Sequence, residues 1–163
     1  MINLTIRSVC PEDLEQVVAI EAACFPTAEA ATRDAFRDRI TAFPDSFLVA
    51  ETADRLVGFI NGCGTNSPVI YDELFYSTRH HLPSGENLAI FGLDVIPEYR
   101  RHGIAFHLMK QFIQLARSSN RRKIILTCKE NLISYYQKFG YVNEGESASN
   151  HGGAQWFNMT LTL

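Results

Sequence analysis

The sequence predicts a three-layer α/β fold, of the α+β kind, in which helices flank one sheet, and three observations predict it. The chain has 163 residues, of which 46% are apolar and 20% charged, enough for one compact domain with a sizeable core. Segments with the strand period of 2 and the helix period of 3.6 follow one another along the chain. No repeat, low-complexity tract or linker divides them, so residues 1–163 are expected to form a single domain.

A strand and then a helix are predicted at the start of the chain. Residues 4–9 alternate apolar and polar side chains, which is typical of a strand with one buried face. Pro11 suits the first turn of a helix and is followed by two acidic residues, so a helix is expected over residues 11–24. The apolar face of this helix carries one acid, Glu21, near its edge.

A second helix and a β-hairpin are predicted next. Thr27 is expected to cap a helix that Pro44 ends, because proline disfavours helical backbone in the residue before it. Residues 47–51 and 56–61 have the pattern of two strands joined by a short polar turn.

A long connection follows, over residues 62–87, rich in Gly, Asn, Ser and Pro. It contains an aromatic group, Tyr71, Phe75 and Tyr76, and a histidine pair, His80 and His81. Two interpretations stay open: a surface loop with a short helix packed by its own aromatic residues, or a substrate lid.

Strands and helices alternate in the second half. Residues 88–95 are nearly all apolar, as in a central strand buried on both faces, and Pro97 ends that strand. A helix is predicted over residues 103–118, where apolar residues recur at helical spacing. The remaining predictions are a buried strand at 123–128, a short helix at 132–139, a strand from Tyr141, and a half-buried last strand that includes Trp156 and Phe157.

Charge and cysteine usage exclude several function classes. A net charge of −3 argues against a broad nucleic-acid-binding surface, so no nucleic-acid partner is expected. The cysteines, Cys10, Cys24, Cys63 and Cys128, are scattered without a CxxC pair, and we expect reduced core residues and no metal. No signal peptide and no stretch of ~18 apolar residues is evident, so we expect no membrane partner and a cytoplasmic location.

The chemistry is expected in residues 93–109, LDVIPEYRRHGIAFHLM, where a buried strand leads through a basic turn into a helix. A helix N-terminus has unpaired N–H groups and a partial positive charge, both suited to a phosphate. Gly103 and Ala105 are small enough for a diphosphate to approach the backbone, while Arg100 and Arg101 supply positive charge. The pattern is neither GxxxxGK[ST] nor GxGxxG, which disfavours kinase-like and dinucleotide-binding functions.

This R-x-x-G-x-A pattern gains weight from a second one, CKENLISYYQKFGY at residues 128–141, which follows one helix and one strand later. Together they resemble the GNAT superfamily of N-acetyltransferases, whose acetyl-CoA motif Q/R-x-x-G-x-G/A is matched by Arg100, Gly103 and Ala105. The resemblance covers nearly the whole chain. Within the superfamily, RSVCPEDLEQVVAIEAACF and LTCKENLISYYQKFGY look most like arylalkylamine N-acetyltransferases.

The resemblance implies a mixed, mostly antiparallel sheet whose central strands, ending at Val95 and Cys128, splay apart around the pantetheine arm of acetyl-CoA. Tyr136 matches the tyrosine placed near the cofactor sulfur, where a phenol with a pKa of about 10 can protonate a thiolate of pKa about 8.5. Cys128, with no histidine beside it, is expected to be a core residue. The expected cofactor-binding residues are Leu93 and Val95 through their backbones, Arg100, Arg101, His102, Gly103, Ile104, Ala105 and Asn131.

One departure from arylalkylamine acetyltransferases concerns the base that deprotonates the amine. Two histidines serve this step in that subfamily, and Ala89 and Phe91 stand at the corresponding positions here. An alkylammonium with a pKa of about 10.4 must lose a proton before attack, so a base or a water chain is required. The candidates Glu21, Glu86, His80 and His81 are each expected to be solvated surface residues, which leaves water as an equal alternative.

The sequence therefore predicts an N-acetyltransferase that moves an acetyl group from acetyl-CoA to a primary amine, with a small (aryl)alkylamine as the expected acceptor. An acyl-CoA-binding sensor without turnover and a peptide N-acetyltransferase stay open. Trp156 could face a pocket or a partner subunit, and exposed edge strands are compatible with a homodimer.

Overall fold

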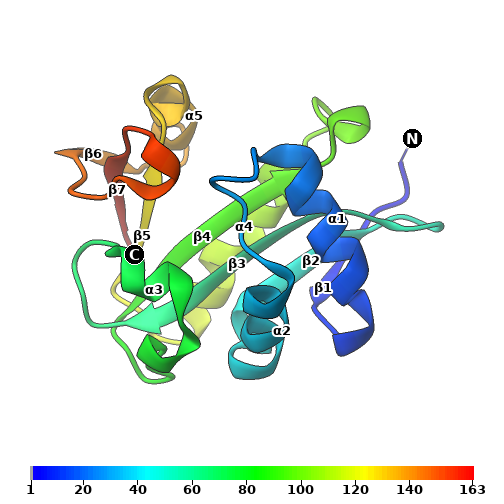
Figure 1. Ribbon diagram of the computed structural model, residues 1–163, viewed down its shortest axis with the longest axis horizontal. Helices are drawn as coiled ribbons and strands as arrows, with labels where there is room; N and C mark the ends of the chain where they lie inside the picture. The colour runs from blue at the N-terminus through cyan, green and yellow to red at the C-terminus, as the bar shows by residue number, and fades with distance from the viewer. Residues whose placement is uncertain (1) are drawn as a thin grey trace.

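Seven strands form one sheet in the order β1-β2-β3-β4-β5-β7-β6 in the computed structural model, which describes residues 2–163 (Figure 1). The strands are β1 (Thr5–Ser8), β2 (Phe47–Glu51), β3 (Leu56–Thr65), β4 (Asn87–Val95), β5 (Lys123–Cys128), β6 (Val142–Glu146) and β7 (Phe157–Thr162). β4 and β5 run parallel, and every other neighbouring pair is antiparallel. The predicted mixed, mostly antiparallel sheet is confirmed, and Met1 of the predicted domain lies outside the described residues.

Helices cover both faces of this sheet. They are α1 (Leu14–Cys24), α2 (Arg33–Ala42), α3 (Asp72–Tyr76), α4 (Ile104–Ser118) and α5 (Ile133–Gln137). α1 and α2 lie in front of the sheet in Figure 1, and α4 lies behind it. The three predicted layers are thus present. Within residues 2–163, no helix is long and apolar enough to cross a membrane.

The α4 helix shows how the sequence pattern becomes packing. Ile104, Leu108 and Phe112 recur every four residues and are buried against β2, β3 and β4. Gly103 precedes the helix with a φ of +78°, a left-handed conformation that glycine adopts without strain. The helix therefore begins at Ile104, after the turn that follows β4.

β4 and β5 separate along their length. They pair only from Asn87–Lys123 to Ala89–Ile125, after which β5 continues along β7. Figure 1 shows the β5–β7–β6 arm diverging from β4. This is the splay that the family resemblance implied, and the wedge that it opens holds the candidate site.

Three local predictions are corrected by the structure. Thr27 does not cap a helix: Glu29 and Ala30 bond to the carbonyl of Pro26 in a turn, and Thr32 caps α2 by accepting a 3.1 Å bond from the Ala35 N–H. β3 continues to Thr65, four residues further than predicted, because it pairs with β4 as far as Asn87. Trp156 precedes β7 and is not part of it.

Candidate active site

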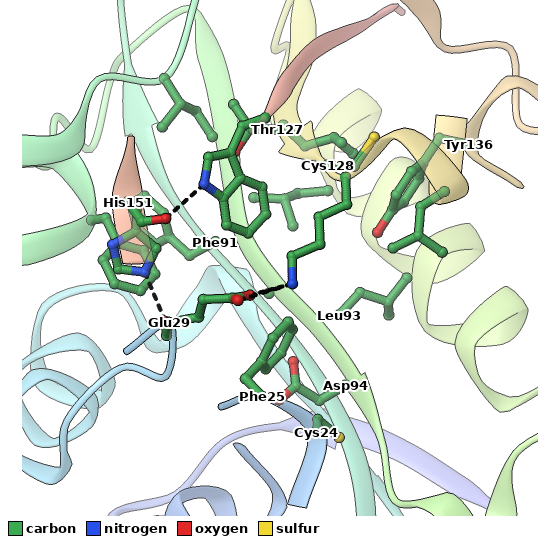
Figure 2. A pocket seen from close by; sticks show the side chains of 18 of the residues that line it. Cys24, Phe25, Glu29, Phe91, Leu93, Asp94, Thr127, Cys128, Tyr136 and His151 are labelled. Carbon is green, nitrogen blue, oxygen red and sulfur yellow. Dashed lines mark hydrogen bonds and ion pairs between the residues drawn. The ribbon is translucent and has the colours of Figure 1, made fainter. Parts of the chain in front are cut away.

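A cavity of about 580 Å³ occupies the wedge between β4 and β5 (Figure 2). It is lined by α1 and the loop that follows it, the second half of β4, the end of β5, α5, and the loop between β6 and β7. Its apolar lining includes Phe25, Phe75, Phe91 and Leu93. The size and the apolar lining suit a small organic ligand.

The predicted catalytic and cofactor-binding residues fall into two groups. Six predicted site residues line the cavity: Leu93, Val95, Arg100, Ala105, Asn131 and Tyr136. The other four, Arg101, His102, Gly103 and Ile104, form the turn at the N-terminus of α4; the first three are exposed, and the Ile104 side chain is buried in the core. Ile104 can therefore offer only its backbone to a ligand.

The backbone of Leu93 and Val95 faces the wedge. The N–H of Ile96 donates to the Val57 carbonyl on β3, and backbone groups alternate direction along a strand, so the groups of residues 95 and 93 point away from β3. The Arg100 Nε donates to the Val95 carbonyl at 3.0 Å, which holds that side chain at the wedge. In the part of β4 that no longer pairs with β5, the backbone groups of Leu93 and Val95 are thus directed into the cavity.

The turn before α4 has the shape of an anion site. Arg101 and Gly103 both have positive φ, +65° and +78°, and turn the chain sharply before the helix. The next N–H groups belong to the first turn of a 15-residue helix, which cannot bond them internally. With Arg100 and Arg101 alongside, this geometry suits a diphosphate.

Tyr136 enters the cavity from α5, and its hydroxyl points toward the wedge in Figure 2. Its ring packs edge-on against Tyr135 and Tyr141, with centroids 5.3 and 5.8 Å away, and the residue is 9% exposed. Burial raises the pKa of Tyr136, so the phenol keeps its proton at neutral pH. It can donate a hydrogen bond to a group in the cavity.

Cys128 lies at the end of β5, beside Tyr136 (Figure 2). Burial raises the pKa of its thiol to about 11, which leaves almost no thiolate at neutral pH. The thiolate is the nucleophilic form of cysteine, so the chemistry of this thiol agrees with the prediction of a core residue.

Glu21 is buried, and the prediction that it would be a solvated surface residue is wrong. The α1–α2 loop folds back over the helix, and the Ala31 N–H donates to Glu21 Oε2 at 2.8 Å. Glu21 lines the cavity with Asp94, which is 1% exposed. Burial, and then the charge of Glu21, raise the pKa of Asp94 well above its usual range.

The other three candidate bases do not line the cavity. Glu86 and His80 are exposed, as predicted, and Glu86 pairs with Arg122 at 3.3 Å. His81 is half-buried, and its Nδ1 accepts a 3.0 Å hydrogen bond from the Gly64 N–H. Glu21 is therefore the one of the four that reaches the cavity.

The loop between β6 and β7, which no sequence pattern predicted, lines one end of the cavity. His151 in this loop is held on both ring nitrogens: its Nε2 donates to the Glu29 carbonyl at 2.8 Å, and its Nδ1 accepts from the Tyr76 hydroxyl at 2.6 Å. The Trp156 indole N–H donates to the His151 carbonyl at 2.9 Å, and Trp156 lines the cavity. Trp156 thus faces the pocket, the first of the two predicted alternatives.

An ion pair joins two walls of the cavity. The Lys129 ammonium, just after β5, lies 2.8 Å from the buried carboxylate of Glu29 on the α1–α2 loop. The same ammonium lies 5.7 Å from the centre of the Trp156 ring. In Figure 2 a dashed line marks this pair at Glu29, close to the bond from His151. Polar contacts therefore tie the β5 end, the α1–α2 loop and the β6–β7 loop around one end of the cavity.

Comparison with known proteins matches residues 14–141 to the acetyltransferase (GNAT) family. The serotonin N-acetyltransferase of Mesocricetus auratus is 26% identical over 161 residues, covering 96% of this chain and 76% of that protein. The probable hydrolase YhcX of Bacillus subtilis is 27% identical over 139 residues, 76% of this chain but only 26% of its own length.

The fold has close structural counterparts. The GphF GNAT-like decarboxylase, solved in complex with isobutyryl-CoA, superposes with a TM-score of 0.85 at 19% identity, over 97% of this chain and 98% of that one. Across residues 2–163, no group of three or more His, Cys, Asp or Glu side chains is placed to hold a metal ion.

Proposed function

Because the chain belongs to the acetyltransferase (GNAT) family, we propose that it transfers the acetyl group of acetyl-CoA to the nitrogen of a primary amine by direct attack. The observation that carries the proposal is the continuity of one site: a basic turn suited to a diphosphate, a wedge with inward backbone groups, and a buried tyrosine hydroxyl in the same cavity. These are the three parts that a long phosphorylated thioester requires.

Different residues bind different parts of the cofactor. Arg100, Arg101 and the backbone of His102–Ala105 bind the diphosphate at the helix N-terminus, where N–H groups and positive charge coincide. The backbones of Leu93 and Val95 bind the pantetheine arm, and Asn131 contributes from the α5 side of the cavity. An inward N–H of β4 can also stabilise the negative charge that develops on the thioester oxygen.

Tyr136 acts at the sulfur. Since its phenol stays protonated, Tyr136 donates its O–H to the departing thiolate. A pure binding module has no need of a hydroxyl at this position, which favours turnover over an acyl-CoA sensor.

The acceptor is a small primary amine and not a peptide. A peptide needs an open groove leading to the thioester, whereas here the β6–β7 loop is tied down across one end of the cavity. His151 binds the Glu29 carbonyl, Ser149 donates to the Asp72 carboxylate, and Lys129 pairs with Glu29. The aromatic lining from Phe25, Phe75, Phe91 and Trp156 suits an apolar or aryl group on the amine. A cytoplasmic location and a homodimer stay predictions.

The test is release of free CoA thiol from acetyl-CoA with a panel of arylalkylamines, polyamines, amino acids and short peptides. We expect release with small amines and none above background with peptides. Tight binding of acetyl-CoA without release from any acceptor would favour the sensor, and release with peptides alone would contradict the small-amine assignment.

A further inference from the structure

Three buried polar atoms lie within 3.8 Å of one point, the position that a Cβ would take on Gly92 of β4. A side chain at residue 92 would begin 3.0 Å from Asp94 Oδ1, 3.5 Å from Asn61 Nδ2 and 3.8 Å from Glu21 Oε1. Apart from the contact between the carboxyl groups of Asp94 and Glu21, none of these three atoms has a hydrogen-bond partner within residues 2–163, although each residue is at least nine-tenths buried. Since buried polar groups are nearly always paired, the arrangement is prepared for a ligand group.

The surplus at this point is of hydrogen-bond acceptors. The proton that Asp94 holds can be shared with Glu21 inside the pair, which leaves carboxyl oxygens of both residues without a further partner, against the single amide nitrogen of Asn61. A carboxylate is an acceptor, and an ammonium carries three donors and no acceptor. A primary ammonium therefore matches the atoms that are left open.

The point is reached from the same cavity as the proposed thioester site. Glu21, Gly92 and Asp94 all line it, and Leu93 separates the last two on β4. Asp94 and Cys24 lie below Leu93 in the view of Figure 2, with Tyr136 across the cavity. An amine bound at Gly92 would thus sit one residue from the backbone that we assign to the cofactor.

The charged and titratable groups around the pair leave it acidic. Arg39 on α2 is the nearby cation, but its guanidinium donates to Asn61 Oδ1 at 3.1 Å and to the Phe75 carbonyl at 2.8 Å, and to neither carboxylate. Cys24 on α1 is neutral, because burial raises the pKa of its thiol, and Tyr136 on α5 is neutral for the same reason. Asp94 holds its proton at neutral pH, because burial and the neighbouring Glu21 raise the pKa of its carboxyl.

We propose that Glu21 is the catalytic base, binding the acceptor ammonium beside Gly92 and taking its proton, with Asp94 as a positioning residue. This inference rests on the proposed function. The Glu21 carboxylate takes one proton from R–NH₃⁺, and the neutral amine attacks the thioester carbon. The C–N bond forms, the C–S bond breaks with its electrons on sulfur, and the second proton of the nitrogen reaches the thiolate. The proton on Glu21 returns to solvent, so each turnover gives the amide, CoA thiol and one proton.

Two variants test the site from opposite directions. Glu21→Gln removes the base but keeps an oxygen that can accept from the Ala31 N–H, and Gly92→Ala fills the point while keeping both acids. Glu86→Gln is the matched control, because Glu86 is an exposed carboxylate outside the cavity. Thermal unfolding of each variant checks that the fold is retained.

We expect Glu21→Gln to lower kcat/KM for the amine by about 100-fold at neutral pH, the scale of general base catalysis. The loss should shrink as the pH approaches the pKa of the amine, which then arrives unprotonated. Gly92→Ala should raise the KM of the amine, and acetyl-CoA affinity by calorimetry should change in neither variant. If the kcat/KM of Glu21→Gln for the amine ran parallel to that of wild type at every pH, the inference would be overturned.

Calorimetric titration of the amine into the CoA-bound protein separates this inference from the proposed function. Amine binding that is lost in Gly92→Ala, with no thiol release in wild type, would keep the ammonium site and refute the enzyme. Thiol release in wild type that Glu21→Gln and Gly92→Ala leave unchanged would keep the enzyme and refute the site.

Discussion

Replacement of Tyr136 by phenylalanine isolates one hydroxyl in the cavity. The ring packs on Tyr135 and Tyr141, and phenylalanine preserves those contacts. Complete proton transfer from a phenol of pKa about 10 to a thiolate of pKa about 8.5 is uphill by about 2 kcal/mol, at 1.36 kcal/mol per pKa unit. Burial raises the pKa of Tyr136 further, which makes that transfer still less favourable. The hydroxyl should therefore act mainly as a hydrogen-bond donor to the departing sulfur.

A hydrogen bond to a charged group contributes about 1.5–3 kcal/mol, so kcat should fall between about 10-fold and 150-fold in Tyr136→Phe. The KM for acetyl-CoA should stay close to that of wild type, because the bond forms only as charge develops on sulfur. Tyr135→Phe is the matched control, since Tyr135 is the adjacent residue, also lines the cavity, and should lose less than about threefold. Thiol release measured at saturating amine and saturating acetyl-CoA gives kcat directly. Equal losses in the two variants, or an unchanged kcat in Tyr136→Phe, would refute the assigned role.

Three further predictions concern the cofactor turn, the end of the cavity lined by the β6–β7 loop and the buried acid. Gly103→Ala should weaken acetyl-CoA binding and cost about 1–2 kcal/mol of stability, because an L-residue at a φ of +78° is strained. Calorimetry measures the affinity and urea unfolding measures the stability. An unchanged affinity for acetyl-CoA would show that the turn is not part of the site. Lys129→Met should admit bulkier amines, because it removes the ion pair with Glu29 that spans the cavity. The readout is a lower KM for branched than for linear amine acceptors. An unaltered preference between branched and linear amines would contradict this. Asp94→Asn should raise the free energy of unfolding at pH 7 but not below pH ~4. The reason is that a carboxyl with a raised pKa in the folded protein makes stability fall as the pH rises above its unfolded pKa, and asparagine removes that loss. Equal effects at both pH values would contradict the burial argument.

Periodicity predicted the fold because the residues of each strand and helix themselves show which face of that element is buried. The strand at Lys123–Cys128 was predicted with both ends correct, and the helix at 103–118 within one residue. The cap of α2 was missed because Thr27 and Thr32 are equally good caps by residue type, and the choice depends on the turn that Pro26 starts.

The sequence predicted the site residues that lie in the two family motifs, but not the other residues of the site. Glu21 was recognised as an acid on an apolar face, but its burial depends on the α1–α2 loop folding back to place the Ala31 N–H on its carboxylate. His151 escaped prediction because the loop around it has no period, and its contact with the Glu29 carbonyl joins residues 122 positions apart. Contacts of that sequence separation leave no local pattern to detect.

The most direct test of the account is mass spectrometry of the products formed from isotope-labelled acetyl-CoA, with small primary amines and peptides offered together at equal concentration. The account predicts labelled acetyl on the nitrogen of a small amine, free CoA in equal amount, and no label on the peptides. An intact labelled thioester after prolonged incubation, or label on peptides alone, would contradict it.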